Sequence, residues 1–144
     1  MKLSILPVEE IRPLRLKILR PGCQPDSVIY DCDIDPTCFH IGAKIKDKVV
    51  GVATFYQLDH KEIKGKKSCR LRGMATDDKF QNQGIGKEVL EYSFLYLKNK
   101  NIDLLWCNAR LIAIGFYKKI GFKVYGDLFE IKNIGPHYDM YIRL

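Results

Sequence analysis

The chain has 144 residues, 47% of them hydrophobic and 28% charged, which fits one folded domain over residues 1–144 and leaves too little length for a second core. The net charge of +7 favours a polyanionic or phosphorylated partner, but the lysines are scattered along the chain, so we expect no nucleic-acid-binding face. No apolar run approaches the roughly 18 residues of a membrane helix, and the short apolar start before Pro7 is no signal peptide, so we expect a cytoplasmic protein without membrane contact.

Side-chain periodicity predicts the elements of the first half of the chain. A short strand is expected at 3–6, followed by a helix at 8–19 with its apolar residues on one side. Residues 20–36 contain three prolines and are predicted to form a loop of the kind that shapes binding sites. Strict alternation then predicts a hairpin of two antiparallel strands, at 39–45 and 49–58.

The second half of the chain alternates strands and helices. Gly73 interrupts a predicted strand, which indicates a bulge or the close approach of a ligand. Gly121 follows an apolar helical stripe and is typical of a helix end. The predicted elements are strands at 68–76, 102–107, 122–125 and 138–142 and helices at 87–99 and 109–120. The resulting order, β-α-loop-β-β-β-α-β-α-β-β, predicts an α/β fold with a mixed, mostly antiparallel sheet that has one parallel pair and is flanked by helices.

Residues 81–86, with the sequence Gln-Asn-Gln-Gly-Ile-Gly, lie between a predicted strand and a predicted helix. Backbone N–H groups at a helix N-terminus bind phosphate oxygens, and glycines let the ligand approach closely. A nucleoside triphosphate loop would need glycine in place of Gln81 and Ser or Thr in place of Glu88, and a dinucleotide fingerprint would need glycine in place of Val89. The segment therefore predicts a phosphate-binding loop of another kind, although two glycines can also serve the turn alone.

The pattern Q-x-x-G-x-G after a strand resembles the pyrophosphate-binding loop of the GNAT acetyltransferases. Two further blocks are similar to that superfamily in the same order. Residues 69–76 resemble its fourth strand, whose bulge exposes backbone groups to the pantetheine arm, and residues 108–122, with N-A, F-Y and G-F, resemble its second sequence block. The resemblance runs from about residue 49 to the C-terminus, while the N-terminal third matches only loosely, so it carries little information about the acceptor.

The resemblance implies an N-acetyltransferase that uses acetyl-CoA as acyl donor. We expect direct attack by the primary amine of a small molecule in a ternary complex, without a metal, and a protein lysine stays open as a less favoured acceptor. The resemblance also implies that the Met74 N–H polarises the thioester carbonyl and that Tyr117 protonates the departing thiolate. Asn108 would contact the pantetheine amide, although an Asn after a strand is also a common helix cap. Homodimers are common in this superfamily. The residues implied to contact the coenzyme are Met74, Ala75, Thr76, Gln81, Asn82, Gln83, Gly84, Ile85, Gly86, Lys87, Asn108 and Tyr117.

The base that takes the proton of the amine is not identified by the resemblance, and the candidates are Glu130, His137 and His40. Glu130 and His137 are expected in the loop and strand start between the last two strands, a segment that can line the acceptor cleft. His40 and Arg72 each alternate with apolar neighbours and could share a cleft on the polar face of the sheet. Each base candidate also has a surface or hydrogen-bonding interpretation, and Tyr117 has one as a core aromatic on an apolar helix stripe.

The five cysteines show no CxxC pair, which fits reduced thiols better than disulfides. Cys32, Cys38 and His40 match no zinc spacing and lack a fourth ligand, so we expect no metal site. Cys107, beside Trp106, is expected to be a small core residue, since direct transfer to an amine needs no acyl-enzyme. Two other functions stay open from the sequence: a sensor that binds acyl-CoA without turnover, and a basic nucleic-acid-binding module.

Overall fold

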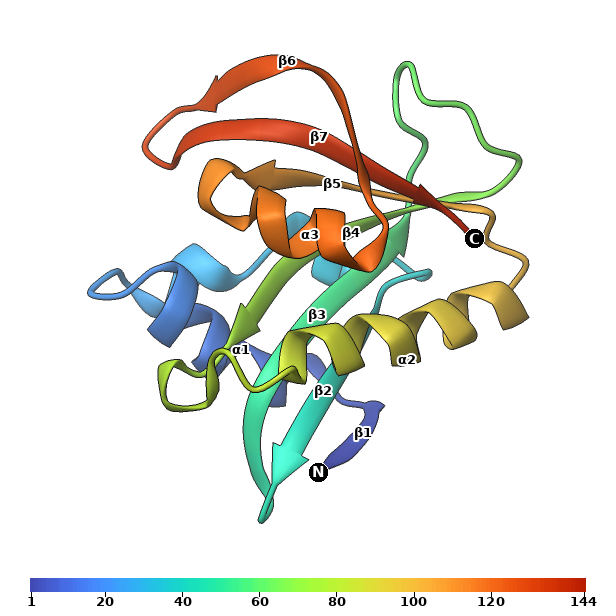
Figure 1. The fold of residues 1–144 in the computed structure, drawn as a ribbon. Coiled ribbons are helices and arrows are strands. Elements are labelled where there is room, and N and C mark those ends of the chain that lie inside the picture. The colour runs from blue at the N-terminus through green and yellow to red at the C-terminus, as the bar shows by residue number, and fades with distance from the viewer.

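The computed structural model describes residues 1–144 as one seven-stranded sheet with helices on both faces (Figure 1). The strand order is β1-β2-β3-β4-β5-β7-β6, and all neighbours are antiparallel except β4 and β5. The predicted α/β class, with its mostly antiparallel sheet and single parallel pair, is confirmed. The strands are β1 (Lys2–Ile5), β2 (Phe39–Ile45), β3 (Lys48–Gln57), β4 (Ser68–Thr76), β5 (Leu104–Arg110), β6 (Lys123–Ile131) and β7 (Gly135–Arg143).

The sheet is covered by α1 (Val8–Leu19) on one face and by α2 (Ile85–Asn99) and α3 (Ile114–Ile120) on the other (Figure 1). Side chains of β3 alternate between two cores, because Phe55 joins the larger core under α2 whereas Val52 joins the smaller core under α1. Cys107 is buried in the larger core, as predicted. None of the helices has the length and apolar character that crossing a bilayer requires.

The parallel strands β4 and β5 form a fork in the middle of the sheet. They pair only from Ser68 and Leu104 to Arg70 and Trp106, and beyond these residues both strands continue without pairing to each other. β5 pairs along its whole length with β7 instead. The second half of β4 therefore presents one backbone edge without a strand partner, and such an edge needs another hydrogen-bonding partner.

The helix expected at 109–120 is wrong at its start, because β5 continues to Arg110. That residue pairs with His137 of β7, and pairing along a central strand overrides the helical spacing of the side chains that follow. A 3₁₀ turn, η4 (Leu111–Ala113), precedes α3. Asn108 therefore lies within a strand and is not a helix cap.

The last two strands are longer than predicted. The strand expected at 122–125 runs on to Ile131, past a bulge at which Gly126 has a φ of 73°. The Gly-Asp dipeptide has the composition of a turn, which hid the continuation. Glu130 and His137, expected in or near a loop, lie within β6 and β7.

Candidate functional site at the fork between β4 and β5

The loop between β4 and α2 contains a run of free backbone donors. α2 begins at Ile85, slightly before its predicted start. None of the backbone N–H groups from residue 81 to residue 87 donates a hydrogen bond within the protein. Asn82 and Gly84 have positive φ angles of 62° and 82°, and left-handed residues in a turn make a concave nest of N–H groups. With the positive end of the helix dipole behind it, this segment suits an anion such as a phosphate.

Asp77 anchors the start of this loop. Its side chain is 1% exposed, accepts the N–H of Lys79 at 3.0 Å and lies 3.2 Å from the ammonium of Lys17 in α1. Its own N–H donates to the carbonyl oxygen of Val50 at 2.8 Å. The hydrogen bond from Lys79, together with Asp78 and Lys17, lowers the pKa of Asp77 to about 2. The loop is thus tied to both α1 and β3.

Gly73 forms the bulge in β4 that the sequence predicts. The register shifts between Val52 and Thr54 of β3, so that Gly73 and Met74 together occupy one place in the ladder. Gly73 has a φ of 60°, and a Cβ there would lie 2.9 Å from the ring of Tyr30. A side chain would therefore meet both a strained backbone and an aromatic ring. The bulge disturbs the ladder at Met74, beside the fork.

Tyr117 and Met74 meet next to the start of α2. The Tyr117 hydroxyl lies 3.7 Å from the Met74 sulfur, and its ring packs against Phe116 and Phe122 with centroids 5.1 Å away. Gly86 packs against the same group of side chains, because a Cβ at residue 86 would lie 3.0 Å from the ring of Phe116. Burial raises the pKa of Tyr117 well above its ordinary value, so the phenol keeps its proton. The free N–H groups, the bulge and a protonated phenol therefore lie together.

The sequence profile of the acetyltransferase (GNAT) family matches residues 8–122. The chain belongs to the GNAT family of acetyltransferases. The uncharacterized N-acetyltransferase YitI of Bacillus subtilis (strain 168) is 30% identical over 141 residues, which cover 98% of this chain and 95% of that protein. Acyl transfer is the general chemistry of this family, and the family that the sequence resembles is confirmed.

Solved structures of other proteins share the fold over nearly the whole chain. Escherichia coli ElaA has a TM-score of 0.80 at 15% identity and covers 98% of this chain and 99% of its own. An aminoglycoside 6'-N-acetyltransferase complexed with coenzyme A has a TM-score of 0.74 at 15% identity. The match covers 99% of this chain and 97% of that enzyme. The smu.2055 protein of Streptococcus mutans UA159 has a TM-score of 0.76 at 22% identity, with 99% of each chain covered. These likenesses concern the fold alone.

Asn108 of this GNAT chain is held in a polar network on the sheet face that α1 also covers. Its side-chain oxygen accepts from Arg70, and its amide nitrogen donates to Asp139 at 2.5 Å. The other carboxylate oxygen of Asp139 accepts from His60 Nε2 at 2.8 Å, because His60 Nδ1 is occupied by the N–H groups of residues 62 and 63. The network leaves one side-chain amide hydrogen of Asn108, besides its backbone, for a ligand.

Arg70, Asp139 and His60 belong to this region but were not predicted from the sequence. The guanidinium of Arg70 lies 5.0 Å from the centroid of the Trp106 ring, and the His60 ring meets the same indole edge-on at 4.9 Å. Asp139 is a charged residue within a strand that has a neighbouring strand on each side, and it is the one local signal that could have indicated the network.

His40 and Arg72 lie in one row across the sheet, with Thr54 between them, as predicted for the polar face. Thr54 Oγ1 accepts from Arg15 at 2.6 Å and lies 2.7 Å from His40 Nδ1, so its own proton points to that nitrogen. Burial, and then the charge of Arg15, lower the pKa of His40 and favour the neutral ring. Because Nδ1 accepts from Thr54, the neutral ring carries its proton on Nε2, and neither nitrogen is free to accept a proton from a substrate.

The loop at 20–36 folds over this face and carries two 3₁₀ turns, η1 (Pro25–Val28) and η2 (Asp31–Ile34). Arg15 is fully buried and donates to both carboxylate oxygens of Asp33, at 2.8 and 2.9 Å. The ring of Tyr30 has two guanidiniums against it, that of Arg15 at 4.0 Å and that of Arg72 at 4.3 Å from its centroid. The loop is therefore held beside the bulge of β4.

Cys32, Asp33 and Cys38 place three donor atoms within 4.8 Å of one another. Both oxygens of Asp33 already accept from Arg15, and Arg72 lies 3.9 Å from the Cys32 sulfur. The hydrogen bond with Cys38, and then the charge of Arg72, lower the pKa of Cys32 to about 7. The arginines compete with any cation for these donors, so we assign no metal to this cluster.

Glu130 and His137, the predicted bases, have different surroundings. Glu130 is exposed on the edge strand β6. His137 is buried, pairs across the sheet with Arg110, and has Nδ1 2.7 Å from the carbonyl oxygen of Gly135. A carbonyl oxygen can only accept, so Nδ1 carries the proton and Nε2 is left basic. No hydrogen bond joins either residue to Tyr117.

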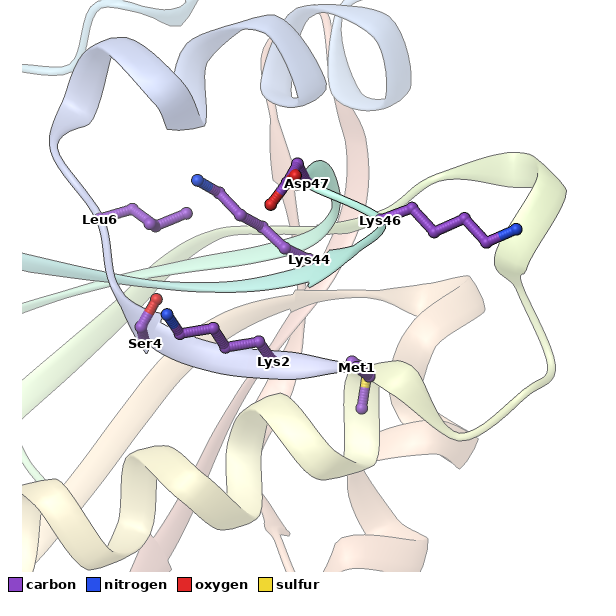
Figure 2. A pocket seen from close by; sticks show the side chains of 7 residues that line it. All are labelled: Met1, Lys2, Ser4, Leu6, Lys44, Lys46 and Asp47. Carbon is purple, nitrogen blue, oxygen red and sulfur yellow. The ribbon is translucent and has the colours of Figure 1, made fainter.

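A hollow of about 490 Å³ lies at the other edge of the sheet (Figure 2). Strands β2 and β3 separate β1 from β4, so the hollow is remote from the fork. We therefore do not take it as the site. It is lined by residues of β1 and β2 and by their immediate neighbours in the chain: Met1, Lys2, Ser4, Leu6, Lys44, Lys46 and Asp47.

Proposed function

We propose that the chain transfers the acetyl group of acetyl-CoA to the primary amine of a small molecule by direct attack in a ternary complex. The observation that supports this best is the run of free N–H groups from 81 to 87, which ends beside Met74 and Tyr117. A diphosphate held there, with the pantetheine arm along the unpaired edge of β4, would bring the thioester to the bulge.

In the proposed reaction the amine nitrogen attacks the thioester carbonyl carbon, the C–N bond forms and the C–S bond breaks. The N–H of Met74, at the bulge, would donate to the carbonyl oxygen as negative charge develops on it. Tyr117 would give its proton to the departing sulfur and regain one from solvent. The surplus proton of the amine passes to a base.

We propose His137 as that base, in preference to Glu130 and His40. Its Nε2 is free to accept a proton, whereas the neutral His40 ring has no free nitrogen and Glu130 is exposed on an edge strand. Replacing His137 with Gln would lower kcat/KM at least about tenfold while acetyl-CoA binding stays unchanged. An unchanged kcat/KM would exclude His137 from this role.

Two measurements test the proposed function. Calorimetry with acetyl-CoA measures donor binding, and the release of free thiol across a panel of amines measures turnover. Binding together with amine-dependent thiol release is the expected result. Binding without turnover on any amine would favour the acyl-CoA sensor, and the absence of binding would overturn the proposal.

A further inference from the structure

We infer that the acceptor carries a carboxylate or phosphate group in addition to its amine, and that Arg72 recognises this oxyanion. The inference rests on the proposed acetyl transfer and names the chemical class of its acceptor.

Three arginines gather on one face of the sheet around the fork. Arg70 and Arg72 belong to β4, and Arg110 follows Asn108 by two residues in β5, so that its side chain points to the same face as the Arg70–Asn108 contact. All three are half-buried. None of them has a carboxylate within salt-bridge distance. Arg70 donates to Tyr56 and Asn108, and Arg110 donates to the carbonyl oxygen of Leu19 at 3.4 Å. These acceptors are neutral, so the positive charges on this face have no counter-ion in the protein.

The carboxylates nearest to these arginines are already engaged. Asp33 accepts from Arg15, and Asp139 accepts from Asn108 and His60. Burial, and then the neighbouring charge of Arg20, lower the pKa of Arg110, which agrees with an excess of positive charge on this face. Such a face disfavours polycationic acceptors such as polyamines or aminoglycosides and favours an acceptor that brings negative charge.

Arg72 is the best placed of the three for an acceptor. It directly precedes Gly73 and Met74 of the bulge, where the thioester carbonyl is proposed to lie. Its guanidinium rests on the Tyr30 ring, and its one polar contact is the Cys32 sulfur at 3.9 Å. Most of its fork of N–H donors is therefore free, and such a fork binds carboxylate and phosphate oxygens in pairs. An oxyanion held there would leave the amine of the same molecule beside the carbonyl carbon.

The test compares acceptors that differ in one group. Phenylalanine is compared with phenylalaninamide and phenethylamine, O-phosphoethanolamine with ethanolamine, and spermidine serves as a polycation. Thiol release gives kcat/KM, and calorimetry of each amine on the coenzyme A-loaded protein gives binding even where turnover is slow. The variants are Arg72→Gln, Arg72→Lys, which keeps the charge but not the fork, Arg110→Gln, and Arg143→Gln as a control on the exposed C-terminal strand end.

We expect the oxyanionic member of at least one pair to be preferred roughly 10- to 100-fold, the contribution of one charge-assisted hydrogen-bonded pair. Arg72→Gln should abolish that preference, and Arg72→Lys should keep part of it. Arg110→Gln should reduce the preference, and Arg143→Gln should leave it unchanged. Acetyl-CoA binding should be the same in all four variants. The inference is overturned if the neutral amines or spermidine bind and react better, or if Arg72→Gln lowers both members of each pair equally. Intact acetyl-CoA binding with no oxyanion preference would defeat the inference while leaving acetyl transfer in place.

Discussion

The Tyr117 hydroxyl faces the sulfur of Met74 at 3.7 Å, and this thioether is its only hydrogen-bonding neighbour. A thioether is a weak acceptor, so the buried hydroxyl lacks a strong partner in the free protein. A coenzyme thiolate leaving at the bulge would be a much stronger acceptor. The contact thus couples the bulge of β4 to α3, and it gives Tyr117 a chemical interpretation besides core packing.

Replacing Tyr117 with Phe removes this hydroxyl and preserves the ring that packs on Phe116 and Phe122. We expect kcat to fall by about 100-fold or more, the contribution of one general acid, with acetyl-CoA binding unchanged. Steady-state thiol release and calorimetry measure the two effects. The matched control is Tyr96→Phe in α2, whose ring packs on Phe39. Equal kcat in the two variants would reduce Tyr117 to a packing residue.

Replacing Gly84 with Ala tests the phosphate loop against a control with the same backbone strain. Gly84 and Gly22 have φ angles of 82° and 78°, and neither has an atom within 4 Å of an added Cβ. Each alanine should therefore cost about 1 kcal/mol of folding free energy. Only Gly84→Ala should also weaken acetyl-CoA binding, by roughly tenfold, because its methyl group enters the space proposed for the diphosphate. Urea unfolding and calorimetry measure both quantities, and equal coenzyme affinity in the two variants would argue against the loop.

The parts of the site that were predicted from the sequence are those that the backbone dictates. Gly73 and Gly84 need left-handed φ angles, and glycine at such positions is a signal that one residue carries by itself. The strand, loop and helix around them follow from local periodicity. Positions that depend on local backbone conformation were therefore located correctly, and the row formed by His40 and Arg72 followed from simple alternation.

The polar network was not predictable in the same way. His60 and Asp139 are 79 residues apart in the chain, and Asn108 and Asp139 are 31 apart. Asn108 and Asp139 meet because β5 pairs with β7 in one register, and His60 reaches Asp139 from the loop between β3 and β4. No local sequence pattern encodes either contact. The pairing of β5 with β7 also extends β5 to Arg110, which shortens the helix expected at 109–120. One long-range strand pairing therefore explains both the missed Asn108–Asp139 contact and the wrong start of the helix.

The network predicts that the loss of Asp139 destabilises the protein, because the Asp139 carboxylate is the acceptor for two other side chains. Asp139→Ala would leave the Asn108 amide and the His60 Nε2–H without their acceptor, at a cost of about 1–3 kcal/mol. Asp127→Ala, at an exposed position of β6, should cost less than about 0.5 kcal/mol. Urea unfolding followed by Trp106 fluorescence measures both, since Trp106 is the single tryptophan and contacts His60. A similar midpoint for the two variants would mean that the network contributes nothing to stability.

Asp77 should give the stability of the phosphate loop a distinct acid dependence. Its pKa is about 2 in the folded protein against an ordinary value of 3.8, chiefly because of the hydrogen bond from Lys79. A lowered pKa stabilises the folded state above the unfolded value, and this contribution is lost as the pH falls from about 4 towards 2. Asp77→Asn keeps an oxygen for the Lys79 N–H but does not titrate. The difference in Tm between wild type and Asp77→Asn should therefore be largest near neutral pH and shrink below pH 4.

Asp77→Ala distinguishes the effect of the hydrogen bond that the Asp77 side chain accepts from the effect of its charge. It removes the acceptor of the Lys79 N–H as well as the carboxylate, so it should be about 1 kcal/mol less stable than Asp77→Asn at every pH. Asp26→Asn, at an exposed position of η1, is the control for general effects of charge and should track wild type across the whole range. Thermal unfolding at pH 7, 5, 4 and 3 provides the comparison. If the Asp77→Asn difference stays constant with pH, the ion pair with Lys17 and the hydrogen bond from Lys79 do not stabilise the charged carboxylate, and the loop is held by its backbone contacts alone.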